Sequence, residues 1–185
     1  IWICTENGLS VFNGTDFKTY YNNPEDSTSL GNNHVLQVLE DTRGNFWVGT
    51  IRGLQRYHRD TDKFSNFNLS YSYIKEFRFI KHIFEDSKGN VWLSTSAPGV
   101  VCLKSETLSP TFYMQKNSNI CSDNINVIFE DRFGNIWIGS QDKGISVMNL
   151  ENYTIVNYAH DPGDDRSLSS NKVFSIGETT DGTVL

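Results

Sequence analysis

Hydrophobic residues in this chain occur in short runs rich in Val, Ile, Phe, Tyr and Trp, and Gly, Asn or Asp bounds each run. Such runs predict β-strands, and none is long enough, at a period of about 3.6 residues, for a helix. In one stretch we expect four strands, A to D in chain order, at Val35 to Glu40, Phe46 to Thr50, Gly53 to Tyr57 and Phe64 to Asn68. The chain is therefore predicted to be all-β.

The strand pattern repeats at a fixed distance. Trp2, Trp47, Trp92 and Trp137 are each 45 residues apart. A repeat of this length built from short strands is typical of a β-propeller, in which each repeat forms one four-stranded antiparallel blade. We predict a partial β-propeller over residues 1–185, about four blade-equivalents long. The expected units are residues 1–34, 35–79, 80–124 and 125–172, and residues 173–185 would start the next one.

The turn between strands A and B has the same residues in each complete unit. In the first of them, Asp41 can accept hydrogen bonds from backbone N–H groups of the turn. Gly44 can take the positive φ that a tight hairpin needs, and Asn45 tolerates a similar conformation. The following Trp is expected to pack between neighbouring blades. The residues of this repeat that we assign to structure are Trp2, Trp47, Trp92, Trp137, Asp41, Asp86, Asp131, Gly44, Gly89 and Gly134.

Charge and cysteine content narrow the possible partners. The chain has 16 Lys and Arg against 22 Asp and Glu, a net charge of −6, and no basic stripe. This argues against nucleic acid or direct contact with an anionic membrane. The three cysteines lack the paired spacing of a zinc site, so we expect no metal and no cofactor. Three free thiols are favoured over a bridge between Cys102 and Cys121.

The sequence does not predict catalytic residues. The most suggestive groups are the adjacent carboxylates Glu40 and Asp41, which recur at the same place in every complete unit. Equivalent turns of different blades lie too far apart to form one acid–base pair, so a structural role is favoured. The four histidines show no motif spacing with Cys or with carboxylates. We therefore expect this segment not to be an enzyme.

The repeated phrase resembles a known family. Residues 125–140, followed by Gly144 and Ile145, look like the two-component regulator propeller repeat, as do residues 30–35 and 168–173 at the start of strand A. Residues 71–79 lack that start. The resemblance implies the periplasmic sensor region of an inner-membrane hybrid two-component histidine kinase, responsive to glycans and regulating polysaccharide-utilisation genes. Kinase and DNA-binding activities would belong to the parent protein.

A ligand is expected at the end of the blades that carries the B–C turns and the D–A loops, because these segments differ between repeats. This end is polar and suits an oligosaccharide, with aromatic residues available for stacking. The candidate ligand-binding residues are Arg52, Asp142, Lys143, His34, Arg78, Asn124, Asn171, Tyr71 and Tyr73. Simple sequence drift in the loops is the alternative for each residue. For the whole segment, the alternatives are a structural or protein-interaction propeller without its own ligand and, third, a propeller lyase or glycosidase.

The strand count also makes a prediction. We expect 16 strands, the last of them a strand A from Val173 to Gly177. An open arc of blades would expose apolar faces and unpaired strand edges at both ends. The expected partners are therefore the remaining blades of a parent propeller or a second copy of the chain.

Overall fold

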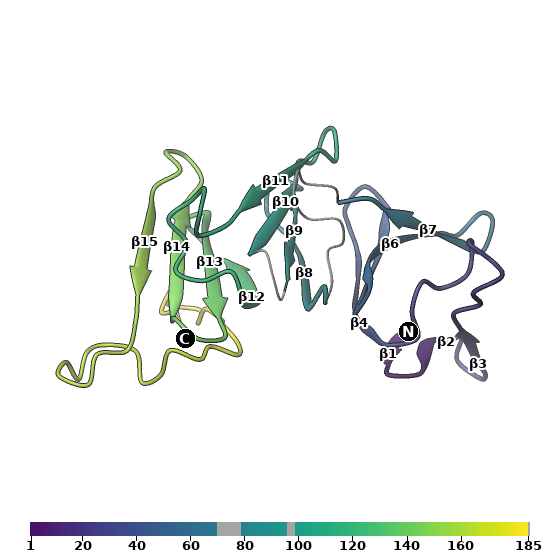
Figure 1. Ribbon diagram of the computed structural model, residues 1–185, viewed down its shortest axis with the longest axis horizontal. Helices are drawn as coiled ribbons and strands as arrows, with labels where there is room; N and C mark the ends of the chain where they lie inside the picture. The colour runs from purple at the N-terminus through teal and green to yellow at the C-terminus, as the bar shows by residue number, and fades with distance from the viewer. Residues whose placement is uncertain (70–78, 96–98, 185) are drawn as a thin grey trace. The chain divides into compact units, whose positions relative to one another are not determined.

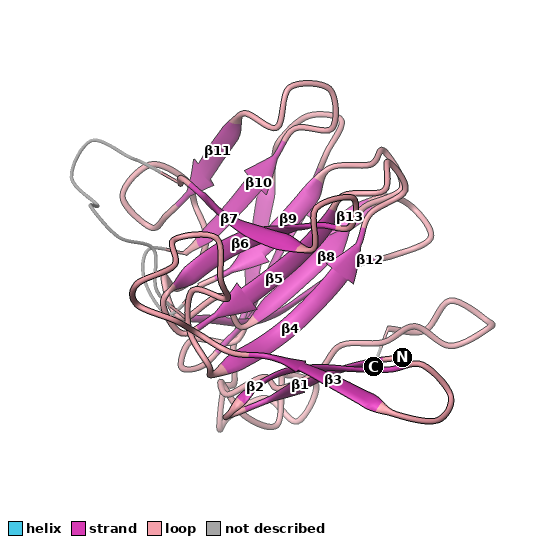
Figure 2. Cartoon of the chain, turned by 90° about the vertical axis from the view of Figure 1, so that its right-hand side faces the viewer, coloured by secondary structure: helices cyan, strands magenta, loops and turns pink. Residues whose placement is uncertain are grey.

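The computed structural model describes residues 1–69, 79–95 and 99–184 (Figure 1). These residues form 15 strands, and Figure 2 shows only strands and loops along the described part of the chain. The strands make four sheets, in which neighbouring strands are antiparallel. The chain divides into two compact units, Ile1–Ile83 and Phe84–Leu185, which are described separately below.

The first unit contains a three-stranded sheet and a four-stranded sheet, and in both the strands pair in chain order. The strands are β1 (Trp2–Thr5), β2 (Gly8–Phe12), β3 (Phe17–Tyr20), β4 (Val35–Glu40), β5 (Phe46–Thr50), β6 (Gly53–His58) and β7 (Lys63–Phe67). Strands A and B of the predicted unit have the observed bounds of β4 and β5. Strand C extends one residue further than predicted, and strand D lies one residue earlier.

The second unit contains two more four-stranded sheets, although β8 begins just before the division between the units. Their strands are β8 (His82–Glu85), β9 (Val91–Ser94), β10 (Val100–Leu103), β11 (Pro110–Tyr113), β12 (Ile125–Glu130), β13 (Asn135–Ser140), β14 (Ile145–Asn149) and β15 (Ile155–Tyr158). Each sheet is one antiparallel meander. The prediction of an all-β propeller made of antiparallel blades is confirmed.

The sixteenth predicted strand, at Val173 to Gly177, is absent from the described residues, which contain only an isolated bridge between Glu178 and Val184 nearby. Residues of this segment instead contact the last sheet through single bonds. The N–H of Val173 donates to the carbonyl of Ser140 at 2.9 Å, and Asn126 Nδ2 donates to the carbonyl of Val173 at 2.9 Å. Isolated bonds of this kind do not form a ladder, so the prediction of a strand here is wrong.

Aromatic and aliphatic side chains fill the space between the two sheets of the first unit. The buried members of this core are Leu9, Leu30, Val35, Phe46, Val48, Tyr57 and Phe64. Trp2 of β1 packs against them, with its ring centroid 4.6 Å from that of Phe46 and 5.2 Å from that of Tyr57. Trp2 therefore joins one sheet to the next, as large aromatic rings do between packed layers.

A polar cluster lies beside this core. Asp62 accepts hydrogen bonds from the hydroxyl groups of Tyr20 at 2.6 Å and Tyr57 at 2.8 Å, and from Lys18 Nζ. The bond from Lys18, with those from the two tyrosines, lowers the pKa of the Asp62 carboxyl to about 2. This cluster links β3 to the turn between β6 and β7.

In the second unit, the core lies between the β8–β11 sheet and the β12–β15 sheet. Trp92 is fully buried in a cluster whose other members are Val100, Cys102, Ile120, Ile125, Ile128, Ile136, Ile138 and Met148. Its ring stacks on that of Tyr113, with centroids 5.6 Å apart. Deleting such a buried ring would leave a cavity that the surrounding strands could fill only in part.

The A–B turns of three sheets are held by the same hydrogen bonds. Asp41 Oδ2 accepts from Trp47 Nε1 and from Asn45 Nδ2, each at 2.8 Å, while Oδ1 accepts from the backbone N–H groups of Arg43 and Asn45. Gly44 has a φ of 80°. Asn45 does not have a positive φ, so that expectation is wrong: its amide instead completes the bonds to Asp41.

The equivalent turns repeat this arrangement, with Trp92 donating to Asp86 and Trp137 donating to Asp131, each at 2.8 Å. At Asp131, burial raises the carboxyl pKa, but the bonds from Trp137 and Asn135 outweigh burial and the pKa is lowered. We call this bonded set of Asp, Asn and Trp the Asp–Trp clasp.

The glutamate that precedes the aspartate faces a different partner. In the second unit, the Glu130 carboxylate accepts from the backbone N–H of Ser87 at 2.6 Å and from its hydroxyl at 2.7 Å. Glu178, which is followed by Thr179 rather than by an aspartate, likewise accepts from the backbone N–H of Arg132 at 3.0 Å. Each of these glutamates thus binds the A–B turn of the preceding repeat, and the adjacent carboxylates do not form a pair.

Candidate ligand-binding site

Every four-stranded sheet has two ends of different character. One end carries the A–B turn with its Asp–Trp clasp, together with the C–D turn. The other end, which we call the loop end, carries the B–C turn and the D–A loop. In the β4–β7 sheet these are residues 51–52 and the segment that begins at Asn68.

The B–C turn is built by one hydroxyl group. Thr50 Oγ1 donates to the carbonyl of Gly53 at 3.1 Å and accepts from the backbone N–H of Arg52 at 3.1 Å. The backbone of Arg52 is thereby held in place, while its side chain is exposed. In the same way Thr5 holds Asn7 and Ser140 holds Lys143, and both of these residues are exposed too. The position before the glycine is therefore available for recognition.

The D–A loop is closed by an Asn or Asp that uses both its side chain and its backbone. Asn33 Oδ1 accepts from the N–H of Asn22 at 2.6 Å, and its carbonyl accepts from the N–H of Gly8 at 2.7 Å. Asp123 and Asn171 make the equivalent pairs of bonds. Asn171, a predicted ligand-binding residue, thus has its side-chain oxygen engaged in closing its loop.

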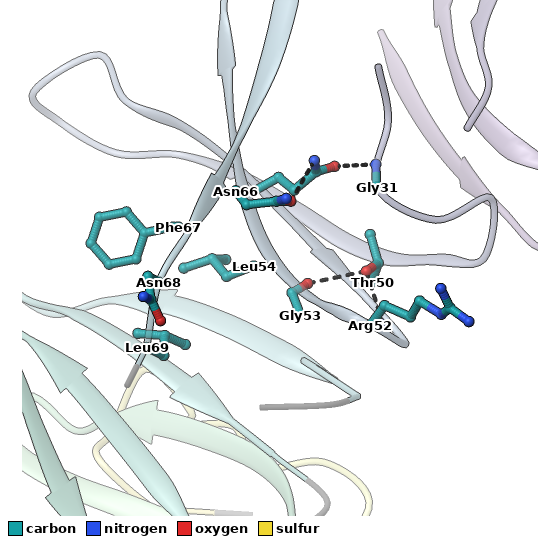
Figure 3. A pocket seen from close by; sticks show the side chains of 10 residues that line it. Gly31, Thr50, Arg52, Gly53, Leu54, Asn66, Phe67, Asn68 and Leu69 are labelled. Atoms are coloured by element: carbon teal, nitrogen blue, oxygen red, sulfur yellow. Dashed lines mark hydrogen bonds between the residues drawn. The ribbon is translucent and has the colours of Figure 1, made fainter. Parts of the chain in front are cut away.

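A pocket of about 480 Å³ lies at the loop end of the β4–β7 sheet (Figure 3). It is lined by Gly31, Thr50, Arg52, Gly53, Leu54, Gln55, Asn66, Phe67, Asn68 and Leu69. All of these belong to the first unit. They come from the ends of β5, β6 and β7 and from the loop that precedes β4, so the pocket lies beside the B–C turn of this sheet and includes both repeated residues, such as Thr50 and Gly53, and a varied one, Arg52.

Gln55 organises the floor of this pocket. Its side chain is 3% exposed; Oε1 accepts from the N–H of Gly31 at 2.6 Å, and Nε2 donates to Asn66 Oδ1 at 3.0 Å. Because a buried amide costs free energy unless it is bonded, these contacts fix the positions of Gly31 and Asn66. Ser146 takes the equivalent place in β14, where it accepts from the N–H of Cys121 and donates to Asn157.

The predicted site residues are not all available for a ligand. Arg52 lines the pocket, whereas the half-buried His34 does not, although its carbonyl accepts from the N–H of Ile51 in the same turn. The structure places Asn124, Asp142, Lys143 and Asn171 in the second unit. Tyr71, Tyr73 and Arg78 lie outside the described residues.

Asp142 has a structural contact within the second unit. It accepts a hydrogen bond of 2.6 Å from the hydroxyl of Ser122, which in turn accepts from the N–H of Asn124. Because Ser122 is buried and water does not reach its hydroxyl group, Asp142 supplies the acceptor that this hydroxyl group needs.

Sequence reasoning missed Gln55, Asn66 and Asn68. A signal was present for Gln55, since it lies two residues before Tyr57 and alternation therefore places its long amide on the same face of the strand as that aromatic residue. Its partner across β6 and β7 is Asn66, which lies opposite in the strand register. The strand register between β6 and β7, rather than any sequence motif, would have predicted the contact between Gln55 and Asn66.

The described residues offer little for redox or metal chemistry. No cluster of His, Cys, Asp and Glu among them has the geometry of a metal site. All three cysteines are free thiols, and burial raises the pKa of Cys102 to about 12. Within the described part of the chain, no helix is long and apolar enough to span a membrane.

Comparison with known proteins identifies the repeat. Residues 29–52, 77–97 and 119–142 match the family described as two component regulator propeller. No curated protein matches the chain.

Solved structures show the same fold. The extracellular domain of a putative hybrid two component system from B. thetaiotaomicron superposes with a TM-score of 0.80 at 19% identity, covering 99% of this chain and 24% of that one. A second such domain from the same bacterium gives 0.54 at 22% identity, with 99% and 30% covered. Virginiamycin B lyase from Staphylococcus aureus, solved with quinupristin, gives 0.66 at 12% identity, with 97% and 55% covered. The chain thus spans about a quarter of the length of the first of these structures.

Proposed function

We propose that this chain, which carries repeats of the two component regulator propeller family, is a ligand-sensing segment of a hybrid two-component sensor histidine kinase. In this proposal the segment is periplasmic, responds to a glycan fragment and thereby controls polysaccharide-utilisation genes. Kinase activity belongs to the parent protein. The similarity in fold to extracellular domains of hybrid two component systems supports this placement.

The observation that carries the proposal is the pocket at the loop end of the β4–β7 sheet. Its polar lining consists of amides, a hydroxyl and one guanidinium group, with Leu54, Phe67 and Leu69 beside them. Sugars present hydroxyl groups along their edges and C–H groups on their ring faces, and such a mixed surface suits both. At the opposite end of the sheet, which carries the Asp–Trp clasp and which we call the Asp–Trp end, the polar side chains of the clasp are hydrogen-bonded to one another.

The proposal is tested by a calorimetric screen of diverse glycan fragments against the full chain. We expect saturable binding of at least one glycan, and we expect Asn68→Ala, a change at an exposed position, to weaken that binding at unchanged melting temperature. A screen without any binder would refute ligand sensing by this segment. Turnover of a glycan during the screen would instead indicate a lyase or a glycosidase.

A structural or protein-interaction propeller is the second candidate. It is favoured by the internal contacts of Asp142 and Asn171, two of the residues expected to bind ligand. A hollow of about 380 Å³ at the β12–β15 sheet also supports this candidate. The half-buried Trp137 lines it, together with Ile145, Leu168 and residues 172–176. We propose that a further blade or a second copy of the chain covers this hollow. Light scattering at micromolar concentration tests the second copy, and a strictly monomeric chain would exclude it.

A further inference from the structure

We infer that the pocket at the loop end of the β4–β7 sheet takes a saccharide bearing an anionic group, a carboxylate or a sulfate, and that Arg52 binds this group. The inference rests on the proposed function, because it specifies the ligand class of the same pocket. It is carried by the charge of the pocket, the position of Arg52 and the chemistry of the remaining lining.

The pocket differs from the rest of the chain in charge. The protein has a net charge of −6, yet Arg52 is the one charged residue among the ten that line this pocket. A positive charge that has no carboxylate beside it among the described lining residues favours binding of an anion. The rest of the chain is acidic, so it does not attract anions nonspecifically. The pocket is therefore set apart electrostatically as a place for negative charge.

Arg52 is also available. Within the described part of the chain its guanidinium group makes no hydrogen bond or ion pair, whereas Arg59 pairs with Glu40 at 2.6 Å and Arg132 pairs with Glu178. Only the backbone of Arg52 is engaged, through Thr50. A guanidinium group presents its donors in a planar fork that matches a carboxylate or a sulfate. Arg52 thus combines a backbone held in place with a guanidinium group that has no bond to the described residues, and both features favour binding of an anion.

The rest of the lining suits a sugar ring. Figure 3 shows the Arg52 side chain extending from its turn away from Phe67, with Asn68 near Phe67 and the Asn66 amide turned toward Gln55, to which it is hydrogen-bonded. The Phe67 ring is held by an edge-on contact with Trp47, 5.0 Å between centroids. An anionic group on the Arg52 side would leave the sugar hydroxyls facing the two amides. The ligand class is thus an acidic saccharide rather than a free anion.

The test uses matched pairs of probes on the full chain. One pair is a panel of uronic-acid oligosaccharides and the same panel after carboxyl reduction; the other is a panel of sulfated oligosaccharides and its desulfated form. Calorimetry is run on the wild type, Arg52→Ala, Arg52→Lys and the control Arg43→Ala. Arg43 lies in the A–B turn at the opposite end of the same sheet, so its removal changes the net charge equally.

We expect an acidic probe to bind at least tenfold more tightly than its neutral partner, with an affinity that falls as salt rises. Arg52→Ala should weaken the acidic probe about 10- to 100-fold, the range for a charge-assisted bond, and Arg52→Lys should restore part of the loss. Arg43→Ala should leave binding unchanged. Which pair responds distinguishes a carboxylate from a sulfate.

Two results would overturn the inference. Equal binding of charged and neutral partners, insensitive to Arg52→Ala, would show a pocket for neutral glycans and would leave the proposed function standing. Absence of binding by every acidic probe would exclude an acidic saccharide, whereas only the broader glycan screen, if it too found no binder, would remove the proposed function itself.

Discussion

The two ends of each sheet use polar residues in opposite ways. At the Asp–Trp end, the carboxylate of Asp131 accepts from the indole of Trp137, the amide of Asn135 and two backbone N–H groups, so its hydrogen-bonding capacity is used inside the blade. At the loop end of the β4–β7 sheet, the guanidinium of Arg52 makes no bond within the described residues. The comparison indicates that one end builds the blade and the other is available for recognition.

The largest effect on stability is expected when a buried tryptophan of the Asp–Trp clasp is removed. Trp92→Ala should lower the free energy of unfolding by about 3–5 kcal/mol, because it empties a fully buried aromatic site and leaves Asp86 without its indole donor. Trp137→Ala should cost less, since Trp137 is only half-buried. Urea unfolding of both variants measures the difference. Equal and small losses would contradict the structural role of the Asp–Trp clasp.

A second test compares two aspartates at opposite ends of one sheet. Asp131→Ala leaves an indole and an amide without their acceptor and should cost about 1–3 kcal/mol. Asp142→Ala leaves one buried donor, the Ser122 hydroxyl, without its acceptor and should cost about 1 kcal/mol, less than the loss of several donors' acceptor at Asp131. Chemical denaturation provides both values. A larger loss for Asp142→Ala would reverse the assignment of the two ends.

The third test uses pH at the turn between β6 and β7. Since bonds from Lys18, Tyr20 and Tyr57 lower the pKa of Asp62 to about 2, the folded state favours its ionised form. The stabilisation is fully present above the ordinary carboxyl pKa of about 4 and is lost as the pH falls through about 2. Asp62→Asn should therefore be less stable than the wild type near neutral pH, and the difference should shrink below pH 4 and vanish only below about pH 2. A stability difference independent of pH would contradict the ionised cluster.

The smallest effect is expected for stability at the loop end. Arg52→Ala should change the free energy of unfolding by no more than about 0.5 kcal/mol, because the exposed side chain has no bond to lose within the described residues. Thermal melts of Arg52→Ala and Arg43→Ala provide the comparison. A marked destabilisation by Arg52→Ala would show that this arginine helps to hold the blade together.

The fold could be predicted from the sequence because the repeat carries its own boundaries. Alternation and turn residues placed strands at Val35 to Glu40 and Phe46 to Thr50, where β4 and β5 are found. The failure at Val173 to Gly177 has a physical reason. A strand needs a partner ladder, and a local pattern of apolar residues does not reveal whether one forms.

The candidate site was predicted less completely, because its contacts depend on which side chains meet across strands. Arg52 was found from its place in a varied turn, but nothing local showed that Gln55 bonds to Gly31 across 24 residues. The internal bond of Asp142 to Ser122 was hidden for the same reason. Repeated residues such as Asn33 and Asn171 close the D–A loops, which the sequence pattern alone did not distinguish from ligand contacts.

Hydrogen–deuterium exchange with and without a bound glycan tests the division between the two ends most directly. The account predicts that a ligand identified in the screen slows exchange at residues 50–55 and 66–69, around the pocket, and leaves the Asp–Trp turn at residues 41–45 unchanged. Slowed exchange at residues 41–45, without any change around the pocket, would contradict it.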